Sequence, residues 1–476
     1  MYEDTATVLF GMPGVRVVEA ETERDGVTTV YVKTTDLSRV VCPGCGSLPE
    51  RAKEAVFTRL RDVPFGDRRI RVVWDKRRWV CPSTSCRRVT FTESLPGLLP
   101  RKRLTTRLRR ALAVGVADGG RTVAEVAGTH GVSWHTAHTA FVAAVDPGLS
   151  VEPGPVTHLG VDEVRRGRPR WEKDPETGET TQIADRWHTG FTDLGGDQGL
   201  LGQVEGRTGK ALVTWLGERD PAWRAGIQTV SMDLCTAFRS GIRQALPDAR
   251  ICADAFHLVQ LANKMVTSVR WRVVREHYGR RGREGDPEYG IKRLLMRNLE
   301  DLGLDQLAKL WNTLIDHPHL ADLHTVWIAK ESLRDLLALR VTRSGTKPTE
   351  TDVQQRWSEL MTWCEANDHI PELVTFAKTL TTWRGEIINA VLLGVSNAGS
   401  EGVNRIQRLD DRLSFGYRNP NNQRRRARVA AGRSARRSRR RRPAKRRVPR
   451  PSRWAVQIQK VLSLSPGVTT DGAHDP

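Results

Sequence analysis

Two aspartates stand where short apolar runs of the sequence end. Asp162 closes the apolar run in THLGVDEV (157–164), and Asp233 closes IQTVSMD (227–233). If these runs form neighbouring strands, the two carboxylates lie close enough to share divalent metal ions. One aspartate at the end of a strand means little, whereas two at matching ends indicate a metal site.

Four cysteines form a second group that suits a metal ion. Cys42 and Cys45 belong to a CPGCG knuckle, and Cys81 and Cys86 form a second, more widely spaced pair. Two close pairs of thiolates are typical of a tetrahedral zinc site, and scattered free thiols are the alternative. The segment RRIRVVWDKRRWV (68–80) alternates apolar and basic residues, which predicts a strand hairpin within a zinc ribbon.

The remaining cysteines and most tryptophans of the second half have a simpler interpretation. These cysteines lack paired partners in the sequence and are expected to be small core residues: Cys235, Cys252 and Cys364. Core positions are also expected for Trp311, Trp327, Trp357, Trp363 and Trp383, the alternative being that one of them stacks on DNA.

The elements that must position Asp162 and Asp233 follow from the periodicity of residues 157–257. Three strands come first, then a helix over 208–220, a fourth strand ending at Asp233, a second helix, and a fifth strand ending at Asp254. This order, with acids at the ends of strands one and four, is the layout of an RNase H-like α/β domain. Residues 265–390 have helical periodicity almost throughout and predict an all-helical insertion.

A helical segment separates the cysteines from the strands. RKRLTTRLRRALAVGVADGG (101–120) predicts a basic amphipathic helix, and residues 121–145 predict two short helices split at Gly131, with Ser133 as the second N-cap. This spacing is typical of a helix-turn-helix, and an ordinary helical hairpin is the alternative. Outward-facing side chains would then meet base edges or phosphates: Trp134, His135, Thr136 and His138.

The charge of the chain indicates a polyanionic partner. The net charge is +21, and residues 51–110 hold 18 Lys or Arg against five acids. Residues 421–450 hold 15 Lys or Arg and no acid, so a disordered tail is expected over 421–476. No apolar run is long enough to cross a bilayer, so a soluble cytosolic protein without membrane contact is expected.

An ordered set of short motifs resembles a known family. Cys-Pro-Gly-Cys-Gly is followed by DKRRWVC, FTES, LGVDE, VSMD and DAFH, and finally by SNAGSEGVNRI and FGYRNP. From about residue 40 to 425 this set is similar to the transposases of the ISL-three insertion-sequence family. The resemblance implies a zinc finger, a helix-turn-helix and a DDE catalytic domain.

The resemblance also implies a catalytic site. Asp162 and Asp233 would be the two aspartates of the DDE triad and Glu401 the glutamate, together holding two Mg²⁺ or Mn²⁺ ions for phosphoryl transfer. Asp254 and His257 match an Asp-x-x-His motif of related transposases and would be accessory. Because Asp254 also ends a strand, it is the alternative second aspartate.

We therefore expect a bacterial, nucleoid-associated DNA transposase that binds terminal inverted repeats and catalyses strand cleavage and strand transfer, assembling as a homo-oligomer on double-stranded DNA. The rivals are a non-enzymatic DNA-binding regulator with a decayed catalytic fold and another nuclease of the same fold. A phosphate-binding stripe or a solvated helix face is expected from Arg405, Arg408 and Arg412. The expected domains are a zinc ribbon (1–95), a helix-turn-helix (96–150), the catalytic domain (151–420) and the tail (421–476).

Overall fold

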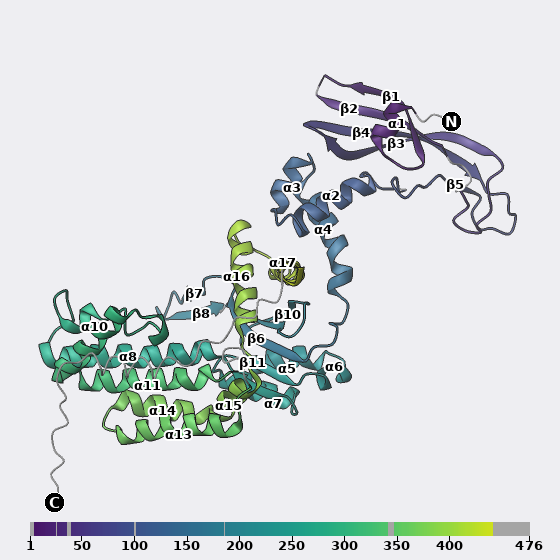
Figure 1. Ribbon diagram of the computed structural model, residues 1–476. Coiled ribbons are helices and arrows are strands. Elements are labelled where there is room, and N and C mark those ends of the chain that lie inside the picture. Colours follow the sequence, from purple (N-terminus) through teal and green to yellow (C-terminus); the bar gives the residue numbers. More distant parts are fainter. Residues whose placement is uncertain are drawn as a thin grey trace, which may run out of the picture. The chain divides into compact units, whose positions relative to one another are not determined.

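The computed structural model describes residues 4–24, 26–35, 40–99, 101–184, 186–340 and 347–440 (Figure 1). The chain divides into two compact units. The first combines the residues up to Val151 with Gln407–Arg433, and the second combines Glu152–Ile406 with the residues from Ser434 onward. Residues 407–420, which belong to the catalytic domain expected over 151–420, group by their contacts with the N-terminal residues.

A twisted sheet forms the N-terminal part of the first unit. Its strands follow the order β1-β2-β4-β3, and β5 pairs with β4. Trp74 and Val72 of β4 are fully buried between Val32 and Leu60 of the neighbouring strands. A six-residue helix, α1 (Thr5–Phe10), precedes the sheet. The strand bounds are β1 (Val15–Thr22), β2 (Val27–Thr34), β3 (Ala52–Phe65), β4 (Arg68–Val80) and β5 (Thr90–Thr92).

The hairpin expected within residues 68–80 is wrong, because this segment is the single strand β4. Its partner is β3, and the turn between them lies at Gly66, whose φ of 63° suits glycine. The sequence of β4 contains no glycine, proline or asparagine at which the chain would turn back, so its alternating pattern continues along one long strand.

Three helices follow the sheet: α2 (Thr106–Ala117), α3 (Val123–Thr129) and α4 (Trp134–Leu149). Side-chain caps fix each start, including a capping box between Thr122 and Glu125 and the expected Ser133 hydroxyl, which accepts from the Thr136 amide. Gly131, with a φ of 60°, makes the turn between α3 and α4. Leu108, Leu112, Val126 and Phe141, among others, form the core of this bundle.

The helices α16 (Ala398–Leu413) and α17 (Pro420–Arg440) follow one another near the end of the described chain. The start of α17 lies in the segment expected to be disordered, and that expectation is wrong for it. Its Val429 joins the apolar core of α2–α4, and the small side chains of Ala427, Ala430 and Ala431 are buried. An arginine-rich helix can therefore pack through alanines, which the composition of the tail did not reveal.

Arginines of α17 also bind the ends of two other helices in the same unit. The buried Arg426 guanidinium donates to the Val116 and Arg121 carbonyls, at 3.2 and 3.0 Å, and forms an ion pair with Asp410. Arg433 donates to the carbonyls of Ala117 and Asp118, and Arg428 to that of Leu149. The last carbonyls of α2 and α4 have no partner within their own helices, so these arginines stabilise both C-termini.

The second unit is built on a five-stranded sheet in the order β10-β9-β6-β11-β12. β6, β9 and β10 pair antiparallel, whereas β6, β11 and β12 are parallel to one another. The strands are β6 (His158–Arg165), β9 (Trp187–Asp193), β10 (Leu200–Glu205), β11 (Thr229–Met232) and β12 (Arg250–Ala253), and β7 (Arg170–Lys173) with β8 (Thr180–Ala184) forms a separate ribbon. The chain crosses between the parallel strands through α5 (Gly209–Gly217), α6 (Pro221–Ala225) and α7 (Thr236–Ala245).

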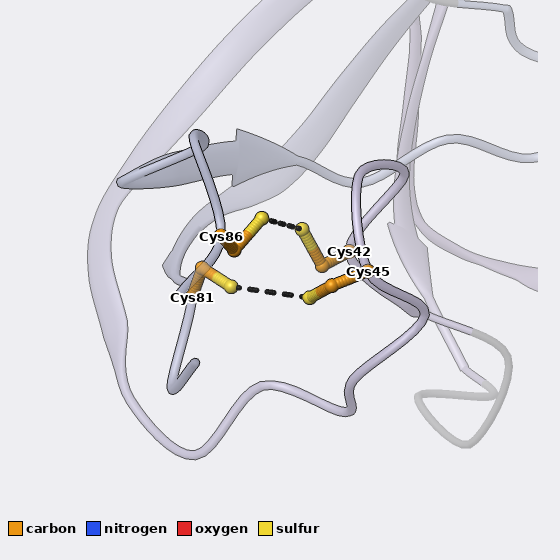
Figure 2. A group of neighbouring side chains, drawn as sticks. All are labelled: Cys42, Cys45, Cys81 and Cys86. Carbon is orange, nitrogen blue, oxygen red and sulfur yellow. Dashed lines mark hydrogen bonds between the residues drawn. The ribbon is translucent and has the colours of Figure 1, made fainter. Parts of the chain in front are cut away.

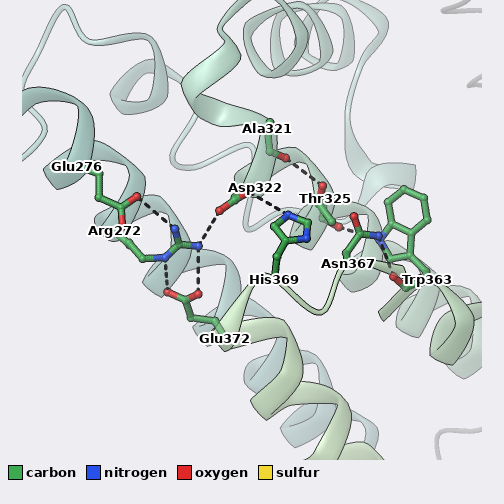
Figure 3. A network of polar contacts seen from close by, with 9 residues as sticks. All are labelled: Arg272, Glu276, Ala321, Asp322, Thr325, Trp363, Asn367, His369 and Glu372. Atoms are coloured by element: carbon green, nitrogen blue, oxygen red, sulfur yellow. Dashed lines mark hydrogen bonds and ion pairs between the residues drawn. The ribbon is translucent and has the colours of Figure 1, made fainter. Parts of the chain in front are cut away.

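Between β12 and α16 the described residues form helices and loops. The helices are α8 (Ala255–Tyr278), α9 (Pro287–Gly290), η1 (Leu299–Asp301), α10 (Leu304–Asp316), η2 (Pro318–Leu320), α11 (Ala321–Ala338), α13 (Glu350–Ala366), α14 (Pro371–Thr382) and α15 (Arg384–Leu393). Three of them meet at Arg272 of α8, which forms ion pairs with Asp322 of α11 and Glu372 of α14 (Figure 3). In the part of the chain that the structure describes, no helix is both long and apolar enough for a membrane span.

The unpaired cysteines and the tryptophans can now be located. Cys252 and Cys364 are buried and Cys235 is half-buried. Trp327, Trp357 and Trp383 are also buried, whereas Trp311 and Trp363 are half-buried and line a cavity between α11 and α13.

Candidate active site and DNA-binding surface

Three aspartates lie at one edge of the second sheet. Asp162 lies within β6, whereas Asp233 directly follows β11 and Asp254 directly follows β12. The parallel register pairs Met232 with Val161 on one side and with Ala253 on the other, so the three aspartates occupy neighbouring positions on adjacent strands. Parallel strands present their carboxyl ends at the same edge, which is why the chain order brings these acids together.

The carboxyl group of Asp162 has a strongly raised pKa. It is buried, and burial together with the charge of Asp233 raises the pKa of its carboxyl group to about 7. The charge of Glu401 acts in the same direction. Asp233 and Glu401 therefore both lie near enough to Asp162 to disfavour its ionised form.

Helix α16 brings Glu401 to the sheet through a close approach to β6. A Cβ atom on Gly160 would overlap the Ser400 hydroxyl and lie 3.0 Å from Asn397 Oδ1. The Asn397 side chain donates to the Val161 carbonyl of β6 at 3.2 Å. Because only glycine leaves this space, the first turn of α16 rests directly on the strand that carries Asp162.

His257 joins the other two aspartates. Its Nδ1 lies 3.0 Å from Asp233 Oδ1 and 3.3 Å from Asp254 Oδ2. Hydrogen bonding to Asp233 and then to Asp254 raises the pKa of His257 to about 10, so the ring is a cation at neutral pH. Among the described residues, the donors of these three side chains lie within 4.8 Å of one another, a group that does not include Asp162 and Glu401.

Two asparagines of this site were missed by the sequence interpretation. The side chain of Asn404 donates from Nδ2 to Asp162 Oδ2 at 2.8 Å. The backbone N–H of Asn397 donates to Asp254 Oδ1 at 3.2 Å. Both residues lie in SNAGSEGVNRI, one turn on either side of Glu401. Their spacing from Glu401 could have identified them. Residues three or four positions apart share one helix face, so polar side chains at these positions are expected near Glu401.

The four N-terminal cysteines converge from two loops of the first unit (Figure 2). Cys45 Sγ lies 3.5 Å from Cys81 Sγ, and Cys42 Sγ lies 3.9 Å from Cys86 Sγ. Burial raises the pKa of the Cys81 thiol to about 12, whereas hydrogen bonding with Ser47 lowers that of Cys45 to about 6. Four sulfurs at such separations suit a tetrahedral zinc ion, which binds thiolates and thereby offsets the burial at Cys81.

The four residues expected on the outer face of α4 differ in exposure. Trp134 and His135 are exposed, whereas Thr136 and His138 are only partly so. The Thr136 hydroxyl lies 2.9 Å from that of the N-cap Ser133, and the His138 ring stacks on Trp134 with 4.6 Å between ring centroids. The first turn of α4 therefore presents mainly Trp134 and His135 to a partner, supported by the other two.

The predicted arginine stripe lies on α16, beyond Glu401. Arg405, Arg408 and Arg412 are all exposed, and so is Arg418 in the following turn. Spacings of three and four residues place the first three on one side of the helix.

Comparison with known proteins places these features in a family. Residues 38–86 match a zinc finger described for transposases of IS204, IS1001, IS1096 and IS1165, and residues 93–145 match the helix-turn-helix domain of transposase family ISL3. Residues 159–427, more than half of the chain, match the DDE domain of the same family, described as a transposase. The chain belongs to the ISL3 family of transposases.

Curated relatives of this ISL3 transposase act in insertion sequences. It is 25% identical over 412 residues to the transposase for insertion sequence element IS1001 of Bordetella parapertussis, covering 85% of this chain and 92% of the relative. It is 29% identical over 217 residues to the transposase for IS1557 of Mycobacterium tuberculosis, covering 41% of this chain and 46% of that one. A match to a chain of the Drosophila P element transposase strand transfer complex covers 69% of this chain and 91% of that chain, with a TM-score of 0.34 and 10% identity. This likeness is too weak to bear on the fold.

Family membership agrees with the function expected from the sequence. The transposase combines zinc-finger, helix-turn-helix and DDE regions in the expected order, and a curated relative is a transposase for an insertion sequence element. DNA transposition is therefore its function, and the non-enzymatic regulator is not favoured.

Proposed function

We propose that this transposase cleaves and joins DNA strands by metal-dependent phosphoryl transfer, with Asp162, Asp233 and Glu401 as the ligands of two Mg²⁺ or Mn²⁺ ions. The observation that carries this proposal is the gathering of Asp162, Asp233 and Glu401 at one edge of the sheet, where burial and then the charges of the other two acids raise the pKa of Asp162 to about 7. Such repulsion costs stability in the metal-free protein, and divalent cations relieve it. All candidate donors are carboxylate oxygens, the ligand type that Mg²⁺ and Mn²⁺ prefer.

The surrounding residues support this assignment by orienting the acids. Asn404 donates to one oxygen of Asp162 and the Glu163 amide donates to the other, at 2.8 and 2.7 Å. These two bonds fix the plane of the carboxylate before any ion arrives. When bound, paired divalent ions activate the attacking oxygen and stabilise the leaving oxygen of an in-line displacement.

Asp233 is the better second aspartate, and Asp254 is better suited to an accessory role. Both carboxylate oxygens of Asp254 already have partners. Oδ1 accepts from the backbone N–H of Asn397, and Oδ2 lies 3.3 Å from His257 Nδ1. Asp254 is also more deeply buried than Asp233. We assign Asp254 and His257 to positioning, with the imidazolium supplying a fixed positive charge beside the phosphate-binding edge.

The other regions would deliver DNA to this site. The sheet order, with three antiparallel strands followed by two parallel additions, supports an RNase H-like fold with the α8–α15 helices as its insertion. We assign a structural zinc to Cys42, Cys45, Cys81 and Cys86, and recognition of terminal repeats to α4 through Trp134 and His135. Assembly as a homo-oligomer on double-stranded DNA at the bacterial nucleoid completes the proposal.

Amide substitutions test the triad. Asp162→Asn, Asp233→Asn and Glu401→Gln keep the side-chain shape but remove the negative charge that a divalent cation needs. Each variant should bind duplex DNA from the element's end as tightly as the unmodified protein, yet lose at least ~10²-fold in Mg²⁺-dependent strand cleavage. Cleavage is measured on labelled duplexes in denaturing gels, with binding measured in parallel.

Asp254→Asn is the matched variant on the neighbouring strand. A positioning role predicts a partial loss of cleavage, smaller than that of Asp233→Asn. A complete loss in Asp254→Asn beside an active Asp233→Asn would transfer the ligand role to Asp254. Undiminished cleavage by all four variants would refute the metal-dependent proposal.

A further inference from the structure

The turn between α16 and α17 holds a phenylalanine fully in solvent. Phe415 is 96% exposed, and its φ of 55° lies in the left-handed region that favours glycine. Leu409 and Leu413 of the last turns of α16 are also more than half exposed. A turn selected only for its shape would have a glycine or asparagine at this position, so the phenyl ring itself requires an explanation.

Buried bonds below the turn impose this backbone conformation. The Tyr417 hydroxyl donates to Asp410 Oδ2 at 2.6 Å, and the other oxygen of Asp410 pairs with Arg426 of α17. The Gly416 amide donates to the Asp411 carbonyl at 2.8 Å, and Gln423 donates to the Asp411 carboxylate. The loop is thus held rigidly from inside while Phe415 points outward.

The exposed charged side chains that flank Phe415 in the sequence are all positive. Within residues 405–419, every one of which the structure describes, the exposed charged side chains are arginines, including Arg408, Arg412 and Arg418. The two acids of this stretch are occupied, because Asp410 binds Arg426 and Asp411 binds Gln423. A rigid apolar tip among arginines matches a polyanion that offers apolar surface between its charges, which describes stacked base pairs between phosphates.

A second copy of this chain fits the surface less well. A symmetric contact between two such patches would bring Arg408 and Arg412 of both copies together, and like charges at an interface oppose binding. The exposed arginines beside Phe415 therefore favour DNA, and not a second copy of the chain, as the molecule that binds this surface.

We propose that Phe415 is a wedge that inserts at a base step of bound DNA, while Arg412 and Arg418 contact the phosphates on either side. This proposal rests on the DNA-transposing function and assigns it a further contact, outside both α4 and the carboxylate edge. Inserting the ring unstacks one step and bends the duplex. The rigid turn matters because a ring already held outward loses little freedom on binding.

The test uses the full-length chain and a short duplex that contains 2-aminopurine, whose fluorescence rises when it unstacks, with a fluorophore pair at the two ends to report bending. The unmodified protein should raise the 2-aminopurine signal and shorten the distance between the ends. Phe415→Ala should abolish both signals and weaken binding about tenfold, the scale of one lost stacking contact. Phe415→Trp should restore them.

Three comparisons separate a wedge from a structural role. Phe415→Gly removes the left-handed strain, so it should raise the thermal midpoint while still losing the DNA signals. Phe57→Ala, at another phenylalanine that is 67% exposed in the same unit, should change neither signal. Arg412→Gln should lower the slope of log affinity against log salt by about one, whereas Phe415→Ala should leave that slope unchanged.

The possible results separate a failure of the wedge proposal from a failure of the DNA-transposing function on which it rests. If the unmodified protein raises the signals and Phe415→Ala raises them equally, the wedge is refuted and the DNA-binding function is retained. If Phe415→Ala instead changes the sedimentation coefficient of the free protein, the patch is a contact between copies. If the unmodified protein binds no duplex, the underlying function fails as well.

Discussion

The Asp162 carboxyl group titrates near neutral pH, unlike an ordinary aspartate. Its pKa rises from 3.8 to about 7 because it is buried and lies near the charge of Asp233. Between these values the folded protein keeps a proton that the unfolded chain has released. The free energy of unfolding therefore falls as pH rises through this window, and the cost is greatest above about pH 7.

This difference gives a measurable pH dependence in the metal-free protein. Asp162→Asn stays neutral at every pH, so it should lose less stability than the unmodified chain between about pH 5 and about pH 8. Urea unfolding in the presence of a chelator measures both midpoints. His257, whose pKa is raised to about 10 by its hydrogen bonds to Asp233 and Asp254, stays charged in the folded state of both proteins across this range. Parallel pH profiles of the two proteins would show that Asp162 has an ordinary pKa.

Zinc binding is tested at the cysteine residues. Changing Cys42 and Cys81 to serine removes one ligand from each pair, and the ribbon should then lose its metal and unfold locally. Metal analysis should give about one zinc per unmodified chain and almost none in the double variant. Cys235→Ser is the control, because this half-buried cysteine lies in the other unit and should leave the zinc content unchanged.

Helix α16 depends on one small residue in the strand below it. Gly160→Ala would place a methyl group against the Ser400 hydroxyl, so α16 must move away from β6 and take Glu401 and Asn404 with it. We expect cleavage to fall at least ~10²-fold with little change in DNA binding, because a displacement of about 1 Å is enough. Gly190→Ala on β9 is the control, since its nearest neighbour would lie at an ordinary 3.4 Å. Equal activity of both variants would show that α16 tolerates the methyl group.

Helix α17 is tested at the buried Arg426. Arg426→Gln leaves the Val116 and Arg121 carbonyls and the Asp410 carboxylate without their donor, so unfolding of the first unit should cost about 3 kcal/mol less. DNA affinity should fall with it. Arg424→Gln removes the same charge from the same helix but loses only a bond to Asn421, so both quantities should change little. If both variants lose affinity equally at unchanged stability, these arginines act as phosphate contacts instead.

The elements differ in how far their sequences predict them. β11 and β12 are short apolar runs followed directly by an acid, whereas β6 continues past Asp162 to Arg165. The parallel register of β6 and β11 then brings Asp162 next to Asp233 without further information. The bond from Asn404 to Asp162 joins residues 242 positions apart and depends on the packing of Ser400 against Gly160, which no local pattern encodes. For α17, the expectation of disorder failed because its arginines bind helix C-termini, a use that composition does not distinguish from solvation.

At the scale of the whole molecule, the first unit is discontinuous in sequence. It joins the residues up to Val151 with Gln407–Arg433, and Glu152–Ile406 of the second unit lie between these two segments. A chain that ends at Ile406 would keep α2–α4 but lose every arginine contact from α17. We expect such a chain to bind duplex DNA at least tenfold more weakly than a chain that ends at Arg440, as measured by gel shift. Equal affinities would show that α2–α4 are complete without α17.

The discontinuity also sets the order of events on the ribosome. Residues are made from the N-terminus, so α2–α4 emerge long before α17 exists, and residues 152–406 of the second unit must be translated in between. If α17 strengthens DNA binding as predicted above, the growing chain reaches its full affinity for DNA only after Asp162, Asp233 and Glu401 have been translated. A prematurely terminated product would therefore bind DNA weakly. It would compete little with full-length transposase for the same DNA sites.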